Sequence, residues 1–571
     1  MRTHYPRTPH LPWSPGATPD DLRAPGPPPG FAGRDVVVTE KLDGENTTLY
    51  RDGLHARSLD SAHHPSRAPV KALQARLAHA VPAGWRICGE NLYARHSLPY
   101  DDLDGHFYGF SVWDERGDCL DWDRTVAFLH GLGIPTPRVL WRGTYDARAE
   151  KALRALKVDT ARQEGYVVRT VEGFGYADFA ARVAKWVRPG HVQTDTHWMH
   201  AAVVPNRLGT RATLWDVRSG AAVDAAALAR AVGWAPDGAG REVPEDAVEG
   251  FGVLGDDRLA GALALLLPTQ PRARLTARLA PGVGMRTARR TADLVGLCPN
   301  LHRPYPDEAR RTGLVRMAHA ADPRVLHAVA RALAPDAAAQ EQVEWSALYA
   351  QDAGLFDAPT PWSAWPFPDL APDAAARCRA EAREAYAQGR VHGPDEAVAA
   401  TWRWRDGAFP HLIHLAGPPG SGKSSFAAGL RADRLVSLDA LREAAGSRAD
   451  QRGNTDVLRA GLDELDAALA HGGTVVWDAT SLNRHQRSLV HAVAARRDAL
   501  VTHAVVLVDE DELLRRNGTR RHPVPPAVLT AQLRRFAPPY PGEAHRTWYV
   551  GVTGRVEDTD TTDTGDEHAY Q

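Results

Sequence analysis

The stretch HLIHLAGPPGSGKSSF, residues 411–426, predicts how the C-terminal part of the chain folds. A short apolar run leads into a glycine-rich turn, and residues that suit a helix follow it. The turn fits the pattern GxxxxGK[ST] over residues 417–424. This pattern predicts phosphate binding where a strand precedes it and a helix follows it, as is expected here. Backbone N–H groups of such a turn and of the helix N-terminus hold phosphate groups. The sequence therefore predicts a parallel α/β domain that binds a nucleotide.

The turn and the first residues of the helix supply the predicted nucleotide ligands. Lys423 is expected to reach the β and γ phosphates, and the Ser424 hydroxyl to bind Mg²⁺. The full set of predicted ligands from this segment is Gly417, Gly420, Gly422, Lys423, Ser424 and Ser425.

Residues downstream of the turn narrow the phosphate acceptor. Asp439 and Arg442 lie three apart just after a short strand, on one side of the next helix. A second strand ends at Asp478, and an arginine-rich segment at 515–536 suits a lid. These features resemble the polynucleotide 5′-kinase branch of the P-loop phosphotransferases. The resemblance implies that Asp439 deprotonates a 5′-hydroxyl, Arg442 contacts the acceptor's 3′ phosphate and Arg520 stabilises transition-state charge. A small-molecule kinase of the same fold is the main alternative.

Lysine is rare in this chain, and one of its few lysines stands in the motif EKLDGEN. Only six of the 68 basic residues are lysine, namely Lys41, Lys71, Lys151, Lys157, Lys185 and Lys423. An arginine guanidinium stays protonated in proteins, whereas a lysine amine can lose its proton and act as a nucleophile. The retention of lysine at position 41 therefore favours a covalent catalytic role over an ordinary surface position.

Further motifs follow Lys41-Leu42-Asp43-Gly44 in a fixed order. They are GEN at 89–91, FYGFSVWD at 107–114, EGYVVR at 164–169 and AKWVR at 184–188. In order and spacing they resemble the nucleotidyltransferase motifs of the covalent ligase superfamily, especially the ATP-dependent RNA ligases. The resemblance covers roughly residues 35–200.

The ligase resemblance implies a role for one residue in each motif. Lys41 would carry AMP as a phosphoramidate, and we expect a nearby cation and Mg²⁺ to lower its pKa. The other implied roles are Glu90 on the ribose, Phe110 stacked on the adenine, Glu164 on a divalent metal and Lys185 on the α-phosphate. The family usually has a second lysine in the last motif, where this chain has Val187 followed by Arg188, the candidate substitute. Arg57 is a weaker candidate for a further polar contact.

The composition of successive segments and the positions of proline and glycine predict a multidomain α+β and α/β protein. We expect a nucleotidyltransferase domain of mixed or antiparallel β structure, a helical middle domain and a P-loop parallel α/β kinase domain. The predicted boundaries are a flexible lead-in at 1–30, the ligase domain at 31–200, the middle domain with a Pro/Trp linker at 201–370, the kinase domain at 371–553 and a disordered acidic tail at 554–571.

The middle domain is the least informative part of the sequence. It lacks the His-Asp dipeptide that an HD phosphohydrolase needs, so a degenerate HD-like domain or a ligase C-terminal module is the interpretation. The motif THWMH at 196–200 fits the start of such a module. His319, Asp322 and His327 fall in what should be one helical region, where Pro323 interrupts the pattern, so we expect no working metal site there.

Bulk composition sets broad limits. A hydrophobic content of 43% and a charged content of 24% are typical of soluble globular proteins. The chain has no run of about 18 apolar residues and no signal-peptide pattern, so we expect no membrane association. Four scattered cysteines suit the reducing cytoplasm. A net charge of −2 means that any nucleic-acid surface must be a local patch.

The ligase-like motifs and the kinase-like motifs together predict a bifunctional RNA repair enzyme. One domain would phosphorylate 5′-OH ends, and the other would seal 5′-phosphate to 3′-OH ends, with ATP and Mg²⁺ or Mn²⁺ as cofactors. RNA with such ends is the expected partner, and no obligate protein partner is inferred. Two alternatives stay open: a DNA-joining enzyme, and a metabolite kinase fused to an inactive ligase-like binding module.

Overall fold

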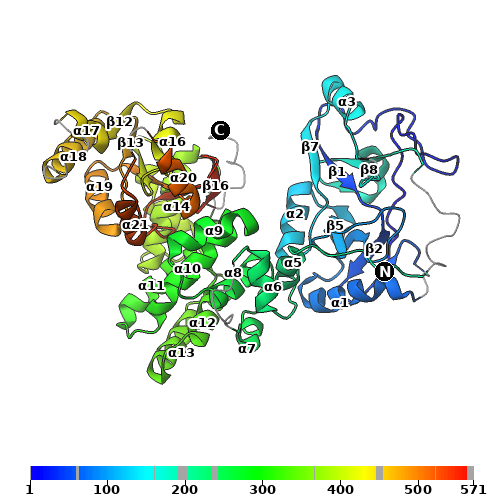
Figure 1. Cartoon of the computed structure of the whole chain (residues 1–571), viewed down its shortest axis with the longest axis horizontal. Coiled ribbons are helices and arrows are strands. Elements are labelled where there is room, and N and C mark those ends of the chain that lie inside the picture. Colours follow the sequence, from blue (N-terminus) through cyan, green and yellow to red (C-terminus); the bar gives the residue numbers. More distant parts are fainter. Residues whose placement is uncertain are drawn as a thin grey trace. The chain divides into compact units, whose positions relative to one another are not determined.

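The structure is a computed structural model that describes residues 2–59, 63–159, 161–190, 202–234, 242–365, 367–444, 454–520 and 523–561. The chain divides into two compact units (Figure 1). The first comprises Met1–Gly240 with Val253–Leu259, and the second comprises Arg241–Gly252 with Ala260–Gln571. The motif THWMH lies outside the described residues.

Two antiparallel sheets form the body of the first unit. One has the order β10-β8-β1-β7, from β1 (Asp35–Lys41), β7 (Val139–Thr144), β8 (Gly165–Thr170) and β10 (Val183–Val187). The other has the order β3-β2-β4-β5-β6-β9, from β2 (Glu45–Tyr50), β3 (Gly53–Ala56), β4 (Arg86–Asn91), β5 (Phe107–Trp113), β6 (Asp118–Cys119) and β9 (Phe174–Gly175). The helices are α1 (Ala68–Leu77), α2 (Trp122–Gly131), α3 (Ala147–Arg154), α4 (Phe179–Arg182), α5 (Ala212–Arg218) and α6 (Ala225–Ala231).

The valine run of β1 shows why this strand is central. Val36, Val37 and Val38 are fully buried, because β1 has neighbours on both edges and packed side chains on both faces. β-branched residues suit such a strand. The strand ends at Lys41, so the buried valines place the lysine at the rim of the sheet.

The lead-in differs from the predicted flexible segment. Leu11 is fully buried, its N–H donates to the Lys185 carbonyl at 2.8 Å, and the Lys185 N–H donates to the Pro9 carbonyl at 2.9 Å. Strand β10 is the edge of its sheet, and an edge strand has backbone groups that need partners. The lead-in supplies those partners, although its proline content suggested disorder.

Helices and one sheet form the second unit. The first helices are α7 (Glu245–Glu249), α8 (Gly255–Leu266, which begins in the first unit's range), α9 (Arg272–Val283), α10 (Met285–Leu301), α11 (Asp307–Ala320), α12 (Pro323–Ala332), α13 (Ala337–Asp352), α14 (Pro372–Ala387) and α15 (Pro394–Ala400). Trp362, Trp365 and Phe367 of the Pro/Trp segment are buried, and both tryptophan rings contact Tyr386 of α14. The segment predicted as a linker therefore docks on this helix.

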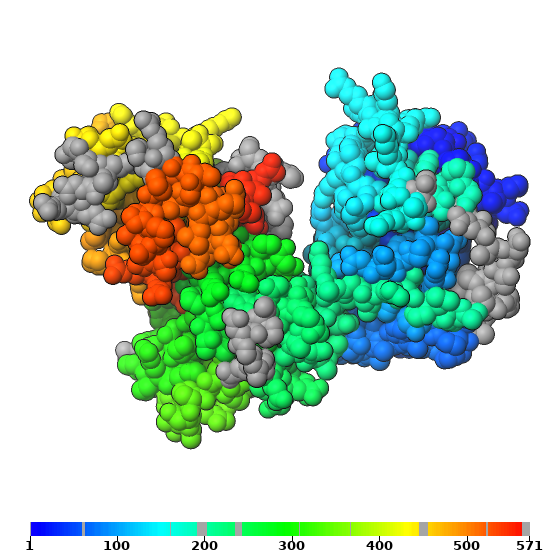
Figure 2. Space-filling view, viewed as in Figure 1, coloured from blue at the N-terminus to red at the C-terminus, as the bar shows by residue number. Residues whose placement is uncertain are grey.

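The sheet of the second unit has the order β12-β13-β11-β14-β15-β16. Its strands are β11 (His411–Ala416), β12 (Arg434–Ser437), β13 (Thr474–Asp478), β14 (Leu500–Val506), β15 (Arg546–Val550) and β16 (Val556–Thr559), all parallel except β16. The accompanying helices are α16 (Lys423–Gly429), α17 (Leu438–Ala444), α18 (Asn454–Ala470), α19 (Arg484–Arg496), α20 (Glu510–Gly518) and α21 (Pro526–Arg535). The orange region that includes α20 and α21 lies on the face seen in Figure 2. The β-rich, helical and parallel α/β parts confirm the predicted fold class.

Residues 554–561 differ from the predicted disordered tail. Strand β16 pairs with β15, and Asp558 forms a buried ion pair with Arg289 at 2.8 Å. The Asp560 carboxylate accepts a hydrogen bond from the Thr547 N–H at 2.7 Å. The prediction counted apolar residues only, whereas these aspartates are held by charge and by backbone donors. Residues 562–571 lie outside the described part of the chain.

Among the described helices, none combines the length and the apolar character needed to span a bilayer.

A buried ion pair yields a stability prediction. Glu45 at the start of β2 and Arg67 just before α1 are 7% and 5% exposed, and Arg67 Nε donates to Glu45 Oε2 at 2.8 Å. Glu45→Ala should destabilise the first unit by about 3–5 kcal/mol, because it leaves a buried guanidinium without its carboxylate. Denaturant unfolding would measure the loss. Asp52→Ala breaks an exposed pair with Arg2 and should cost about 1 kcal/mol or less, and an equal loss in both variants would contradict the prediction.

Candidate functional site

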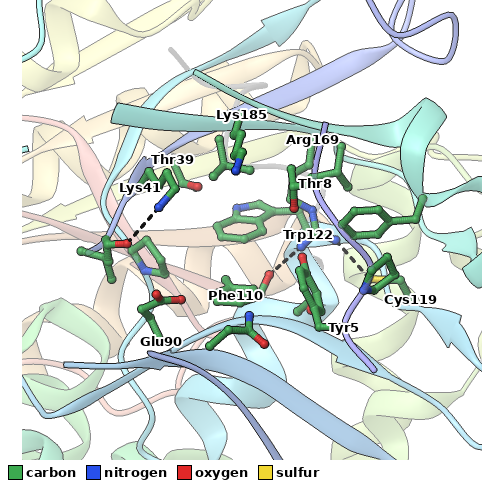
Figure 3. Close-up of a pocket in the computed structure, with 18 of the residues that line it drawn as sticks. Tyr5, Thr8, Thr39, Lys41, Glu90, Phe110, Cys119, Trp122, Arg169 and Lys185 are labelled. Atoms are coloured by element: carbon green, nitrogen blue, oxygen red, sulfur yellow. Dashed lines mark hydrogen bonds between the residues drawn. The ribbon is translucent and has the colours of Figure 1, made fainter. Parts of the chain in front are cut away.

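A pocket of about 170 Å³ in the first unit brings the ligase-like motifs together (Figure 3). The first sheet contributes Lys41 from β1 and Lys185 from β10, and the second sheet contributes Glu90 from β4 and Phe110 from β5. In Figure 3 the two lysines approach from one side, opposite Glu90 and Phe110. Arg57 also lines this pocket.

The residues that follow Lys41 form the corner between the two sheets. The Asp43 carboxylate accepts hydrogen bonds from the N–H groups of Ser97 and Leu98, both at 2.8 Å. A side chain at Gly44 would place its Cβ 2.5 Å from the Asn91 carbonyl oxygen. The aspartate and glycine of this motif therefore position Lys41, because they hold the corner closed against neighbouring backbone.

Glu164 is the ionic partner of Lys41. In the register of β1 and β8, Lys41 lies opposite Gly165, which brings the Glu164 carboxylate to the Lys41 amine. Burial acts to lower the pKa of Lys41, but Glu164 and Glu90 outweigh it, so the Lys41 pKa is raised. This differs from the lowered pKa predicted from the sequence, which assumed that cations, rather than two carboxylates, would dominate around the amine.

Glu90 lies close to the same lysine. Its carboxylate accepts a hydrogen bond from the Gly44 N–H at 3.2 Å. Burial raises the pKa of Glu90 to about 8, and the charge of Glu164 adds to the effect of burial. Mg²⁺ and Mn²⁺ prefer oxygen ligands, and the Glu164 carboxylate supplies such oxygens next to the Lys41 amine. The residues present therefore fit a divalent cation beside Lys41.

The last ligase motif is only partly represented in the pocket. The Lys185 amine lies 3.7 Å from an Asp21 carboxylate oxygen, and burial, followed by the charge of Lys41, lowers the Lys185 pKa. Arg188 is buried and does not line this pocket, although its N–H donates to the Glu164 carbonyl at 3.1 Å. The structure thus brings Lys185, but not the Arg188 side chain, to the site.

Sequence reasoning missed three residues of this site. Tyr5 of the lead-in meets the Phe110 ring edge-on at 5.3 Å between ring centres. Arg169 of β8 lines the same pocket and donates to the Phe110 carbonyl at 2.6 Å. Asp21, the partner of Lys185, also belongs to the lead-in. Of these three, only Arg169 could have been found from the sequence, because it is the last residue of the motif EGYVVR. No local sequence pattern shows that the lead-in returns to the pocket.

The second candidate site is the glycine-rich turn between β11 and α16. Gly420 and Gly422 have φ angles of +84° and +103°, a backbone region that favours glycine. Lys423 is buried, and its amine donates to the Pro418 carbonyl at 2.9 Å. Burial lowers the pKa of Lys423 to about 8, against the opposing charges of Asp478 and Asp439. Gly417 begins the turn, and Ser425 lies exposed in the first turn of the helix.

Acidic residues from neighbouring strands face the turn. The Ser424 hydroxyl donates to Asp478 at 3.0 Å, which places a carboxylate next to the predicted metal-binding hydroxyl. A hydroxyl and a carboxylate oxygen together suit a magnesium ion. Asp439 and Arg442 form an ion pair at 2.6 Å on α17. The predicted base and the predicted acceptor-binding arginine therefore contact each other in this structure.

An unpredicted arginine reaches the turn from the predicted lid segment. Arg516 of α20 donates to the Ser421 carbonyl at 3.2 Å and to the Val552 carbonyl at 2.8 Å. Arg520, the residue predicted from the sequence, is exposed, and its charge acts on the Lys423 pKa. Arg516 and Arg520 are four residues apart in the arginine-rich segment, and the sequence alone did not show which of them reaches the turn.

The three residues considered in the middle region each have separate partners. His319 on α11 contacts Arg383 at 2.7 Å, and burial lowers its pKa to about 4. Asp322 caps α12 by accepting from the N–H groups of Arg324 and Val325. His327 lies between the Pro323 carbonyl at 2.7 Å and the Ser346 hydroxyl at 3.2 Å. Two helices replace the single helical region predicted, because Pro323 begins the second one.

Family models match the two parts of the chain that contain these sites. Residues 34–187 match the model described as RNA ligase, and residues 412–539 match the model described as AAA domain. These matches confirm the predicted ligase and P-loop phosphotransferase resemblances of the two parts of the chain. A search of curated proteins found no match.

Solved structures resemble parts of the chain. A chain of the Pnkp1/Rnl/Hen1 RNA repair complex is 20% identical over 22% of this chain and 44% of its own length, with a TM-score of 0.21. The Naegleria gruberi RNA ligase with PPi is 17% identical over 28% of this chain and 51% of its own, with a TM-score of 0.22. A gluconokinase from Sinorhizobium meliloti 1021 is 25% identical over 25% of this chain and 83% of its own, with a TM-score of 0.20. The chain thus spans about half or less of the first two proteins.

Proposed function

We propose that the protein repairs broken RNA by phosphorylating 5′-OH ends and then sealing the 5′-phosphate to a 3′-OH. The arrangement around Lys41 is the observation that carries this proposal. A lysine at the end of a buried strand lies in a pocket with two carboxylates, a second lysine and an aromatic ring. Covalent transfer of AMP needs these groups: a nucleophile, metal ligands, a cation for phosphate and a surface for the base.

In the sealing reaction, the Lys41 ammonium first gives a proton to solvent, and the neutral amine attacks the α-phosphate of ATP. A P–N bond forms, the bond between the α-phosphorus and the bridging oxygen breaks, pyrophosphate leaves, and the nitrogen gives a second proton to solvent. AMP then passes to the RNA 5′-phosphate, and attack by the 3′-OH joins the strands and releases AMP. Glu90 and Phe110 would hold the nucleoside, Lys185 would contact the α-phosphate and Glu164 would be a metal ligand. A bound Mg²⁺ or Mn²⁺ would supply positive charge to the phosphates.

In the kinase reaction, Asp439 takes the proton of the RNA 5′-OH as its oxygen attacks the γ-phosphorus of ATP, and ADP leaves. Lys423 and the N–H groups of the turn hold the phosphates, and Ser424 with Asp478 would hold the metal. Arg442 would exchange its contact with Asp439 for the acceptor's phosphate. Arg520, and Arg516 beside it, would neutralise charge on the transferred group.

Joining of defined strands tests the proposal. Strands with 5′-OH and 3′-OH ends, supplied as RNA and as DNA, would be incubated with the protein, ATP and Mg²⁺ or Mn²⁺. We expect the RNA strands to be joined. Faster joining of DNA would favour the DNA-joining alternative. Phosphorylation of a metabolite without any protein–AMP adduct would favour the metabolite kinase with an inactive ligase-like module.

The general base gives a specific prediction for the kinase domain. Asp439→Asn should slow 5′ phosphorylation about 10²- to 10⁴-fold, because an amide cannot accept the proton. ATP binding should change little, because the substitution leaves the glycine-rich turn and Lys423 unchanged, and an asparagine can still accept a hydrogen bond from Arg442. Transfer of label from γ-labelled ATP to 5′-OH RNA would measure the rate. Asp456→Asn, an exposed change on α18, is the control, and equal rates in all three proteins would remove Asp439 from its role.

The cellular compartment is also part of the proposal. Cys88, Cys119, Cys298 and Cys378 are free thiols buried in the fold. Burial raises the pKa of each thiol, which keeps it in the less reactive protonated form. Such cysteines suit a reducing compartment, and we place the protein in the cytoplasm.

A further inference from the structure

Three histidines gather in the core of the second unit, away from both sites described above. They are His414 on β11, His503 on β14 and His491 on α19. One ring nitrogen from each residue can be chosen so that all three nitrogens lie within 4.8 Å of one another. Neither the ligase motifs nor the kinase motifs account for these residues.

The topology brings the three rings together. His414 and His503 are directly paired in the parallel ladder of β11 and β14, so their side chains emerge on the same face of the sheet. Helix α19 places His491 next to this pair, with ring centres 5.6 Å from His414 and 4.7 Å from His503. Two strands and one helix thus each contribute one imidazole to a common point.

The hydrogen bonds of the cluster leave ring nitrogens without partners. His414 and His503 are fully buried, and the Nδ1 atom of each has no hydrogen-bond partner. His491 Nε2 and His503 Nε2 are 2.8 Å apart. Buried polar atoms normally have partners, because leaving one unsatisfied costs about 1–3 kcal/mol. The cluster thus contains two buried ring nitrogens whose partner could be a ligand.

Surrounding groups orient the cluster. The Ser481 hydroxyl lies 2.8 Å from His414 Nε2, which fixes the orientation of that ring. Ser481 has a φ of 44°, a strained conformation for a residue with a side chain, and it places the hydroxyl next to His414. Partners of this kind orient metal-bound imidazoles in proteins.

The positive charge of Arg487 acts on the cluster and is paired with a carboxylate. Arg487 on α19 is buried and donates to Glu543 at 2.9 Å and to the Ala537 carbonyl at 2.9 Å. Burial, with smaller contributions from neighbouring charges, lowers the pKa of all three histidines, so the imidazoles are neutral and keep a lone pair for a ligand. His545 and Glu381 form a second pair close by, at 3.5 Å.

We propose that His414, His491 and His503 bind one zinc ion, which joins α19 to β11, the strand that leads into the glycine-rich turn, and to the neighbouring strand β14. Neutral imidazole nitrogens suit zinc rather than magnesium or calcium. Zinc–nitrogen bonds of about 2.0–2.1 Å in a tetrahedral site separate the nitrogens by about 3.3 Å. The chosen nitrogens lie within 4.8 Å of one another, so zinc binding requires the rings to turn until the nitrogens reach that spacing. The cluster supplies three ligands, and a water molecule completes the four.

The site has a structural role. β11 leads directly into the glycine-rich turn, and Ser481 follows the strand that ends in Asp478. A zinc ion at this point therefore stabilises the end of β11, which leads into the turn before Lys423, and the segment after β13, which ends at Asp478, without touching the nucleotide. The proposal is independent of the reactions assigned above, because any P-loop phosphotransferase would require the same strands.

Metal content tests the proposal first. Protein purified without a histidine tag, loaded with Zn²⁺ and dialysed against a weak chelator, should hold about one zinc per chain by mass spectrometry of the metal, since the cluster is a single site. His503→Gln and His491→Gln should lose at least about nine-tenths of it. His485→Gln, an exposed change on the same helix α19, should keep it. Equal zinc in wild type and in both cluster variants would overturn the proposal.

A measurement on the wild-type protein alone tests the proposal even if the histidine variants do not fold. Removal of zinc with EDTA should lower the thermal midpoint of the second unit, and addition of Zn²⁺ should restore it. Co²⁺ in place of zinc should give the visible absorption of a tetrahedral site. A zinc content at background, no cobalt spectrum and an unchanged midpoint would show a hydrogen-bonded histidine cluster and no metal site.

Discussion

Lys41→Arg should abolish the covalent protein–AMP adduct although it preserves the positive charge. A guanidinium stays protonated and cannot be the nucleophile. The fold should survive, because an arginine at this position can still pair with Glu164. Incubation with α-labelled ATP, followed by denaturation and electrophoresis, would show label on the wild type and none on the variant.

The specificity of this result depends on a matched control. Lys71→Arg changes an exposed lysine of α1 and should leave the adduct unchanged. Phosphorylation of 5′-OH RNA should also persist in Lys41→Arg, since Lys423 belongs to the second unit. Labelling of Lys41→Arg at the wild-type level would mean that another residue carries the AMP, and the proposed sealing reaction would fail.

Lys423→Ala should prevent the joining of 5′-OH ends while leaving the joining of 5′-phosphate ends intact. The Lys423 amine is buried in the glycine-rich turn and would contact the transferred phosphates, so its loss should reduce phosphorylation to background. Pre-phosphorylated strands bypass this step, because Lys41, Glu90, Glu164 and Lys185 are unchanged. Gel analysis of strands with each type of 5′ end would measure both reactions.

Lys41→Ala should show the reverse pattern and accumulate phosphorylated, unjoined strands. Arg431→Ala removes an exposed positive charge after α16 and should join both kinds of end. Failure of Lys423→Ala to seal pre-phosphorylated strands would contradict the independence of the two active sites. Joining of 5′-OH ends by Lys423→Ala would instead remove the kinase step from the proposal.

Part of both sites could be predicted from sequence because it consists of local patterns. Residues 411–426 combine a strand, a turn and a helix start, and the glycines at 420 and 422 have the φ angles that such a turn requires. Likewise, Lys41, Asp43 and Gly44 lie within one strand end and one corner. The resemblance to known families assigned these residues their roles, which stay predictions, while family models match the two parts of the chain that contain them.

Other features depend on residues far apart in the chain. The Lys41 pKa is raised because the β1–β8 register places Glu164 beside an amine 123 residues away. The lead-in contributes Tyr5 to the pocket and brings Asp21 to Lys185 because edge strand β10 needed backbone partners. Strand β16 forms where composition suggested disorder, since Arg289 and the Thr547 N–H hold its aspartates.

By itself, the sequence determined the order of the domains, the nucleotide-binding turn and the identity of the candidate nucleophile, because each is written within a few consecutive residues whose spacing matches one local structure. Only the tertiary structure decided what surrounds those residues: Glu164 beside Lys41, Asp478 beside Ser424, and three histidines from separate elements at one point in the core. Strand order, register and helix packing set these contacts, and a one-residue shift of register would turn the same side chains to the opposite face.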